Sequence, residues 1–339
     1  MIKPSVSKIL ILALLSFLSI STRAQTFHNP VIDKSWPDPT VWTDGSRYYT
    51  ICTGVRTIMA SEDLVNWTDL KTAPLSDKAL ASAKAVGKKL WAPDVVKIND
   101  RWMLYLTCYE SAEYCGISVF ESESATGPWE FIGRLTHSTE NGIKDSIDPE
   151  VVMDPESGKV WLFFGSIGGI HRVQLTDDGK KLAEGSSFEH VAGLDININS
   201  SRSRVYEGAY LHRKDGYWYL FASSGQYFNH TYGIVVGRSR TLNGTFTDKE
   251  GKKMSGGHAS AILKSESKDD FFGPGHNGEI LTDSKGQDYI LYHCHHRVEG
   301  KDAGRKTLLQ QIFWDKDGWP YFETGKPVSV EHMPNIDRK

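Results

Sequence analysis

Long apolar runs are absent from most of this sequence, and the one that exists lies near the N-terminus. There Lys3 and Lys8 precede an apolar run, and small or polar residues lead from it to Ala24, which is the pattern of an export signal. The run is too short to predict a convincing membrane-spanning helix. We therefore expect residues 1–24 to be a signal peptide and residues 25–339 to be a secreted or periplasmic protein outside the membrane.

Cysteine is scarce, because the chain has only four in 339 residues. Four cysteines cannot hold a fold of this size by disulfides, so a hydrophobic core must do so. Two interpretations remain open for Cys108 and Cys115, which are either paired across a hairpin or separate buried thiols.

A large excess of charge of one sign is also missing. Removal of Lys3, Lys8 and Arg23 with the signal takes the formal net charge from −3 to −6. No block of Lys and Arg is present that would bind a phosphate backbone. Nucleic acid is therefore not an expected partner.

What the sequence does contain is one pattern that occurs five times. Its clearest part is a strand rich in aromatic or β-branched residues that follows a turn signal such as Asp44-Gly45 or Asp215-Gly216. The five expected strands cover Tyr48 to Ile51, Trp102 to Leu106, Val160 to Phe164, Tyr217 to Phe221 and Tyr289 to Tyr292.

A second run lies ahead of each turn and begins at a polar residue. These residues are Asp38, Asp94, Asp148, Glu207 and His276, with gaps of 56, 54, 59 and 69 residues between them. That spacing suits one four-stranded propeller blade, so we predict an all-β fold, a single five-bladed β-propeller over residues 25–339. Residues 77–86 are the exception, with a helical periodicity. If each polar-headed run is an innermost strand, all five polar residues lie at one end of the central axis.

Several carboxyl groups at one end of an axis suit the hydrolysis of glycosidic bonds. That reaction needs a carboxylic acid for the leaving oxygen and a carboxylate on the opposite side. Crowded carboxyls drive their pKa values apart, so one stays protonated while another is ionised. Asp38, Asp148 and Glu207 are the better candidates, because Asp94 could equally cap the entry to its strand.

The segments around these residues resemble those of glycoside hydrolase family 43, from about Asn29 to His296. The resemblance rests on Pro37-Asp38-Pro39, Trp91-Ala92-Pro93-Asp94, Ser146-Ile147-Asp148-Pro149, Tyr206-Glu207-Gly208 and Gly273-Pro274-Gly275-His276-Asn277. It implies a five-bladed propeller that hydrolyses arabinans, arabinosides or xylosides with inversion. It also implies that Asp38 is the general base, that Glu207 is the general acid and that Asp148 tunes and orients the acid.

The same resemblance suggests further contacts. His276 matches a histidine that reaches an ion, usually calcium, on the axis of the arabinan-cleaving members. Calcium prefers oxygen ligands, so waters would have to complete its shell, and a hydrogen-bonded core histidine is the competing interpretation. For substrate binding we select Trp36 and Trp91 as stacking aromatics. We add Asp94, Asn277 and Arg297 as polar contacts.

The substrate is less well determined by the motifs. Pro37 before Asp38 is closer to the exo-acting xylosidases and arabinofuranosidases, whereas the segment around His276 is closer to arabinanases. We expect a monomer that hydrolyses α-L-arabinosyl linkages in plant cell-wall arabinan or arabinoxylan. The alternatives are an exo-acting β-xylosidase or α-L-arabinofuranosidase, and a propeller that binds carbohydrate without cutting it. A binding protein would not need an acid on the axis.

Overall fold

A computed structural model of the chain describes residues 25–194 and 205–337. The predicted signal peptide, residues 1–24, lies outside the described residues. Among the described residues, no helix is long and apolar enough to cross a membrane.

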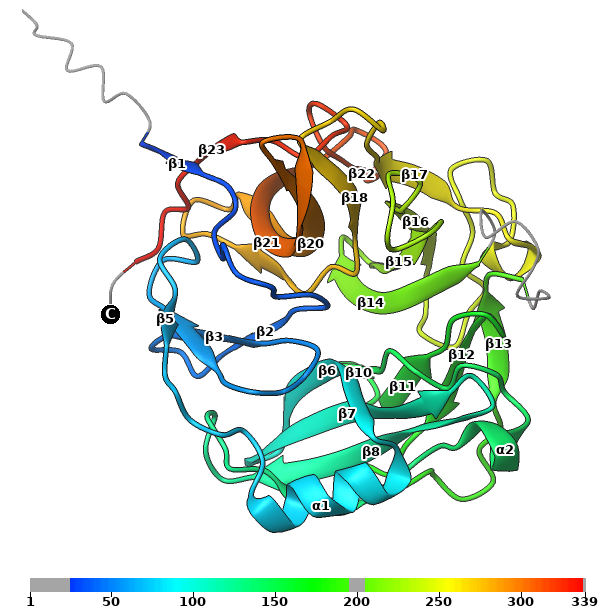
Figure 1. Cartoon of the computed structure of the whole chain (residues 1–339). Coiled ribbons are helices and arrows are strands. Elements are labelled where there is room, and N and C mark those ends of the chain that lie inside the picture. Colours follow the sequence, from blue (N-terminus) through cyan, green and yellow to red (C-terminus); the bar gives the residue numbers. More distant parts are fainter. Residues whose placement is uncertain (1–24, 195–204, 338–339) are drawn as a thin grey trace, which may run out of the picture.

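Five antiparallel sheets stand around a central axis, as Figure 1 shows. Blade 1 contains β2 (Thr40–Thr43), β3 (Tyr48–Ile51), β4 (Met59–Ser61) and β5 (Thr68–Asp69). Blade 2 contains β6 (Lys89–Ile98), β7 (Arg101–Ser111), β8 (Tyr114–Ser122) and β9 (Glu130–Arg134). Blade 3 contains β10 (Glu150–Met153), β11 (Val160–Phe164), β12 (Ile170–Gln174) and β13 (Glu189–Ala192).

The last two blades repeat the arrangement. Blade 4 contains β14 (Tyr206–Lys214), β15 (Tyr217–Ser224), β16 (Gly233–Ser239) and β17 (Ser260–Leu263). Blade 5 contains β18 (Phe271–Gly275), β19 (Ile280–Thr282), β20 (Asp288–Val298), β21 (Lys301–Trp314) and β22 (Pro320–Tyr321). The predicted five-bladed propeller is confirmed, and each of the five expected aromatic strands is the second strand from the axis.

The core consists of apolar layers between neighbouring blades. Trp42 and Ile51 of blade 1 pack with Leu104 and Trp129 of blade 2, and comparable clusters lie at the other four junctions. Trp129 is fully buried because it closes the outer edge of this layer. Hydrophobic burial between the sheets, rather than disulfides, therefore stabilises the ring, and all four cysteines are buried free thiols.

The ring closes where the first described residues meet the last blade. β1 (Thr26–His28) pairs with β23 (Val330–His332). The Asn29 side chain donates to the carbonyl of Leu309 (2.9 Å) and accepts from its N–H (3.0 Å). These contacts join segments about 280 residues apart and fix blade 5 against blade 1.

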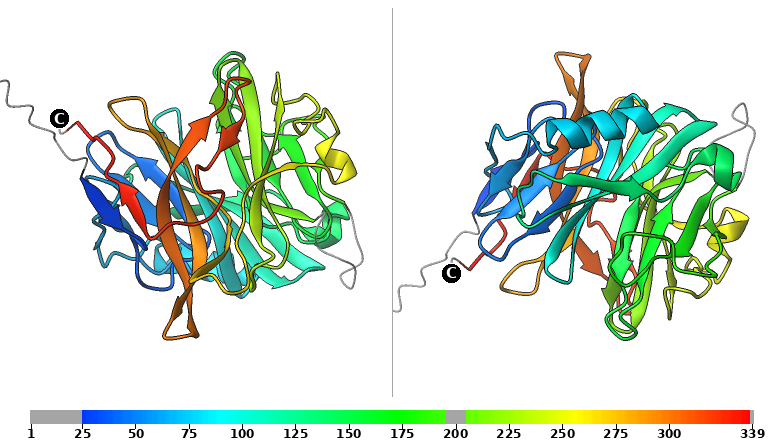
Figure 2. Two further views of the ribbon diagram at one scale, coloured as in Figure 1. Left: turned by 90° about the horizontal axis from the view of Figure 1, so that it is seen from above. Right: turned by 90° about the horizontal axis from the view of Figure 1, so that it is seen from below.

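Three helical segments interrupt the strands in the part of the chain that the structure describes. The predicted helix at residues 77–86 is confirmed as α1 (Asp77–Val86), which is capped by Ser76 and buries Ala79 and Ala83. The others are α2 (Ser138–Asn141) and the 3-10 turn η2 (Met254–Gly256). In the right-hand view of Figure 2, α1 and the projecting hairpin of β20 and β21 lie toward the same end of the propeller.

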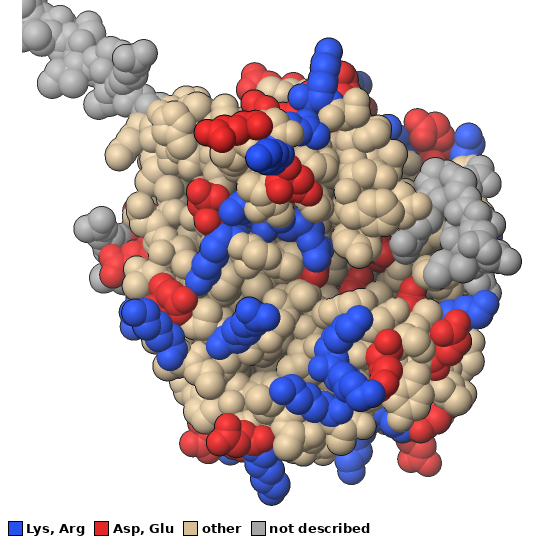
Figure 3. All heavy atoms as spheres, in the orientation of Figure 1, with Lys and Arg blue, Asp and Glu red and all other residues tan. Residues whose placement is uncertain are grey.

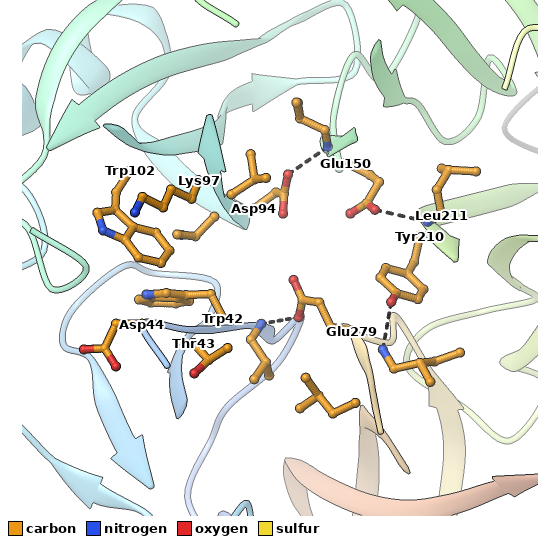
Figure 4. A pocket seen from close by; sticks show the side chains of 16 residues that line it. Trp42, Thr43, Asp44, Asp94, Lys97, Trp102, Glu150, Tyr210, Leu211 and Glu279 are labelled. Atoms are coloured by element: carbon orange, nitrogen blue, oxygen red, sulfur yellow. Dashed lines mark hydrogen bonds between the residues drawn. The ribbon is translucent and has the colours of Figure 1, made fainter. Parts of the chain in front are cut away.

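A circle of side-chain hydrogen bonds surrounds the axis inside the ring. In each blade, one side chain of the inner strand accepts a hydrogen bond from a backbone N–H of the next blade. The pairs are Thr40 with Val95 (3.4 Å), Asp94 with Val151 (2.8 Å), Glu150 with Leu211 (3.1 Å), Tyr210 with Ile280 (2.8 Å) and Glu279 with Val41. The last pair returns to blade 1, so the circle is complete, as four of its bonds in Figure 4 illustrate.

Candidate active site

The inner strands begin at the axis in an unusual backbone conformation. Asp38, Asp148 and His276 have φ values of 55°, 57° and 45°, which lie in the left-handed region that non-glycine residues rarely adopt. The backbone N–H of each is held by a side chain of the neighbouring blade, namely His293, Thr107 and Ser223 at 3.2, 3.0 and 2.7 Å. The fold therefore imposes this conformation where three candidate residues stand, as is common at functional sites.

One pocket of about 330 Å³ lies at this end of the axis. It is lined by Asp38, Asp148, Glu207 and His276, together with side chains from all five blades. The three carboxyl groups are each no more than 9% exposed. The structure thus brings together four of the five polar residues that head the predicted inner strands.

Asp38 is surrounded by groups that favour its ionised form. Its carboxylate accepts hydrogen bonds from Thr53 Oγ1 (2.6 Å) and Arg305 Nη1 (3.0 Å). The rings of His293 and His276 approach within 3.2 and 3.4 Å. Burial alone would raise the pKa of Asp38, but Arg305 and the two histidines outweigh it and hold the pKa well below its usual range.

Glu207 is held from both sides. Ser166 donates to one carboxylate oxygen (2.6 Å) and Tyr232 donates to the other (2.8 Å). These two bonds fix the orientation of the carboxyl group toward the pocket that it lines.

Asp148 carries the opposite perturbation to Asp38. Burial raises its pKa well above the usual value, and the negative charges of Glu207, Asp38 and Asp145 add to the effect. Among the described residues, the N–H of Gly208 donates a hydrogen bond to its carboxylate (3.2 Å), which partly offsets this effect. Neighbouring carboxyls titrate together, so a proton stays in this cluster at pH values where an isolated carboxyl would be ionised.

Replacing Arg305 with Gln should lower kcat/KM at acidic pH. Loss of the guanidinium raises the pKa of Asp38. Asp38 must be ionised to act as the base, so activity is lost at a higher pH than in the wild type when the solution is acidified. We expect the ratio of kcat/KM at pH 5 to that at pH 7 to fall about tenfold. Lys306→Gln, next to it in sequence but paired with Asp33, is the control. An unchanged ratio in Arg305→Gln would contradict this view of Asp38.

His276 lies against the carboxylates and not among a set of metal ligands. Its Nδ1 is 3.4 Å from Asp38 and 3.9 Å from Asp148, and burial lowers its pKa, which favours the neutral ring. Among the described residues, no group of three or more His, Cys, Asp or Glu side chains could hold a metal ion. Its Nε2 has no hydrogen-bond partner among the described residues, so a single nitrogen ligand remains compatible with this site.

The residues selected for substrate binding lie in different places. Trp91 lines the pocket and stacks on Tyr109 with ring centroids 3.9 Å apart. Trp36 is only 3% exposed and borders an adjoining trough. Asn277 is buried and donates to the carbonyl of Gly278, and Arg297 donates to the carbonyl of Asp269, so neither lines the pocket.

The expected position of Asp94 is wrong. It lines a different pocket, farther along the axis, with Glu150 and Glu279 (Figure 4). The residue that matches Asp38 in strand phase is Ala92, which has a φ of 35° and whose N–H is held by Thr53. Asp94 stands two residues beyond Ala92 in β6, so it falls deeper along the axis, where it accepts from Val151 in the circle of hydrogen bonds.

The buried carboxyl of Asp94 should make the stability of the protein depend on pH. Burial raises the pKa of Asp94 to about 7. The folded protein therefore binds this proton more tightly than the unfolded chain does, and the stabilisation that is full below pH 4 is lost as pH rises through about 7. Asn cannot ionise and keeps the oxygen that accepts from Val151. We expect Asp94→Asn to raise Tm by about 2–4 °C at pH 8.5 and to change it little at pH 4.

The control for this experiment is Asp100→Asn, an exposed carboxyl in the turn between β6 and β7. Differential scanning calorimetry at both pH values gives the comparison. If Asp94→Asn lowered Tm equally at pH 4 and pH 8.5, the carboxyl would be ionised and needed in that form.

The family model described as glycosyl hydrolases family 43 matches residues 27–320. The chain belongs to this family. It is therefore a glycoside hydrolase by descent, and the pocket with Asp38, Asp148 and Glu207 is its candidate active site.

Other family 43 proteins resemble the chain over most of its length. An extracellular exo-α-(1→5)-L-arabinofuranosidase of Cellvibrio japonicus is 30% identical over 307 residues, which cover 84% of this chain and 85% of that protein. An extracellular endo-α-(1→5)-L-arabinanase of Bacillus subtilis is also 30% identical, over 84% of this chain and 87% of the relative. The first name describes an exo-acting enzyme and the second an endo-acting one.

The solved structures agree with this family assignment. The α-L-arabinanase of Cellvibrio cellulosa in complex with arabinohexaose matches with a TM-score of 0.73 and 28% identity. The match covers 86% of this chain and 96% of that one. The predicted family and propeller architecture are therefore confirmed.

Four side chains that hydrogen-bond Asp38 or Glu207 in this family 43 pocket were not selected from the sequence: Thr53, Ser166, Tyr232 and Arg305. Thr53 and Ser166 had a readable signal, because both stand two residues beyond an aromatic strand. Similar places are occupied by Thr107, Ser223 and His293, which accept hydrogen bonds from the backbone N–H groups at the start of the inner strands. Arg305 had no such signal, since it reaches Asp38 from 267 residues away.

Proposed function

We propose that this chain is a secreted enzyme that hydrolyses α-1,5-linked L-arabinosyl bonds of plant cell-wall arabinan with inversion. One observation carries the proposal: Asp38, Asp148 and Glu207 share a pocket in which opposite pKa shifts act on two of them. The names of the Cellvibrio and Bacillus relatives, both extracellular and both specific for α-1,5-linked arabinose, support this substrate and location.

The roles follow from the surroundings of each carboxyl. Asp38, with its lowered pKa, is the base that removes a proton from the attacking water. Glu207, oriented by Ser166 and Tyr232, donates a proton to the leaving oxygen. Asp148, with its raised pKa, helps to retain a proton in the cluster and contacts the backbone next to the acid. Water attacks from the side opposite the leaving group, which gives inversion.

We further propose that His276 is the one direct protein ligand of a calcium ion on the axis. Its free Nε2 supports this assignment, and water oxygens would supply the rest of the shell. A bound cation would favour ionised carboxyls nearby. The neutral His276 ring also keeps its Nδ1 beside Asp38 without an ion.

The decisive experiment is hydrolysis of linear, debranched arabinan by the purified chain. We expect reducing sugar to be released from arabinan and not from β-1,4-xylan. A ladder of oligosaccharides would indicate endo cleavage, whereas a single short product from the start would indicate exo cleavage. Activity on xylan alone would replace this proposal with a β-xylosidase, and tight binding without hydrolysis would replace it with a carbohydrate-binding protein.

A further inference from the structure

A trough of about 890 Å³ adjoins the catalytic pocket on the side of blades 1 and 2. The two hollows share Thr53 and Trp91, and the trough also reaches Pro37, the residue before the base. Its outer side is formed by α1 through Leu80 and Lys84. A polymer that enters the pocket therefore has a continuous path along this trough.

The side chains of the trough carry charge of only one sign. Five cations line it and no Asp or Glu does: Lys34, Arg56, Lys84, Lys88 and Lys89. We call these five residues the basic trough. Figure 3 shows Lys and Arg side chains gathered on this face between the central hollow and α1. This is unusual in a chain whose formal net charge is negative.

Only two of the five cations have a carboxylate partner in the described residues. Lys34 pairs with Asp69 at 2.9 Å, and Lys88 pairs with Glu110 at 2.5 Å. Arg56, Lys84 and Lys89 are exposed and form no ion pair with the described residues. Their uncompensated charges create a positive potential that attracts anions toward the pocket.

Aromatic rings lie among these charges. Lys89 Nζ lies 5.5 Å from the ring centroid of the half-buried Trp91, which itself stacks on Tyr109. Aromatic faces pack against sugar rings, and ammonium or guanidinium groups form charge-assisted hydrogen bonds with carboxylates. The two kinds of group together suit a sugar that carries a carboxylate.

We propose that the basic trough binds uronic acid residues of the polysaccharide to which the arabinosyl chain is attached. The inference rests on the proposed function, because it assigns the uncleaved, anionic part of the same substrate. Neutral sugars would gain nothing from three cations that have no carboxylate partner among the described residues. The trough would thus direct the enzyme to arabinan that is still joined to an acidic backbone.

The test is titration calorimetry of the full chain with hexagalacturonate and with a neutral galactohexaose, at pH 6.5 and 20 mM NaCl. We expect hexagalacturonate to bind at least about tenfold more tightly and to lose this advantage in 300 mM NaCl, because salt screens exposed charges. The triple variant R56Q/K84Q/K89Q should bind hexagalacturonate at least about tenfold more weakly than the wild type does. Circular dichroism checks that it is folded.

The control triple variant K253Q/K285Q/K316Q removes the same charge from exposed positions outside the trough. It should bind hexagalacturonate as the wild type does. Equal binding of the two hexasaccharides, or equal losses in the two triple variants, would overturn the proposal. Because calorimetry needs no turnover, a chain that prefers hexagalacturonate but leaves arabinan intact would refute only the proposed function. A chain that cuts arabinan without this preference would refute only the trough.

Discussion

Replacing Glu207 with Gln is expected to lower kcat on linear arabinan about 10³-fold while leaving the fold intact. The amide has nearly the same shape as the carboxyl but cannot donate its proton to the leaving oxygen. Ser166 and Tyr232 still have an oxygen to bind on one side, and each hydroxyl can rotate to accept on the other. Steady-state release of reducing sugar, with binding of an arabino-oligosaccharide measured separately, gives kcat and affinity.

The matched control for Glu207→Gln is Glu279→Gln. Glu207 is buried and Glu279 is half-buried, but Glu279 lies in the circle of hydrogen bonds, outside the catalytic pocket. We expect its kcat to stay within about twofold of the wild type. An aryl arabinoside with a good leaving group, which departs without protonation, should restore much of the activity of Glu207→Gln. A Glu207→Gln protein as active as wild type on arabinan would show that another group is the acid.

Replacing Asp38 with Asn is expected to lower kcat by about 10³-fold or more on every substrate, good leaving groups included. The amide cannot take the proton of the attacking water, and a better leaving group does not help that step. Thr53 and Arg305 keep an oxygen to bind, so the pocket should hold its shape. Kinetics on arabinan and on the aryl arabinoside give the comparison with Glu207→Gln.

Glu207→Gln and Asp38→Asn are thus distinguished by their activity on the aryl arabinoside, and not by the size of the loss on arabinan. Asp38→Ala should regain activity with azide, a small nucleophile that needs no base, and the product should be an arabinosyl azide of inverted configuration. Asp63→Asn, in a turn of blade 1 outside the pocket, is the control and should behave as the wild type does. Recovery of Asp38→Asn on the aryl substrate, to the extent seen for Glu207→Gln, would mean that the roles are exchanged.

Most of the architecture could be predicted because it is local in sequence. The predicted strand at residues 48–51 coincides with β3, that at 160–164 coincides with β11, and the helix at 77–86 has the expected bounds. Turn residues and the alternation of apolar side chains act over a few neighbours, so they can be read without knowing the fold. The fivefold repeat then predicts the number of blades.

The candidate site was predictable only in part. The polar heads of blades 1, 3, 4 and 5 meet in one pocket, but Asp94 was assigned to it by its chemical type and not by its phase. Ala92, and not Asp94, occupies the position in blade 2 that Asp38 occupies in blade 1, and this is visible only from the hydrogen bonds to the neighbouring strands. The chemical type of a residue therefore identifies it as a candidate for the site, and its position along the paired strands decides whether it reaches the pocket.

The sequence by itself determined that this protein is a five-bladed propeller of family 43, and it identified Asp38, Asp148 and Glu207 as candidates. Only the tertiary structure decided that Arg305 holds Asp38 ionised, that Ser166 and Tyr232 orient Glu207, and that five cations line one trough. The physical reason is distance along the chain. Electrostatic and hydrogen-bonding energies depend on separation in space. A closed ring brings together side chains that lie hundreds of positions apart in the sequence.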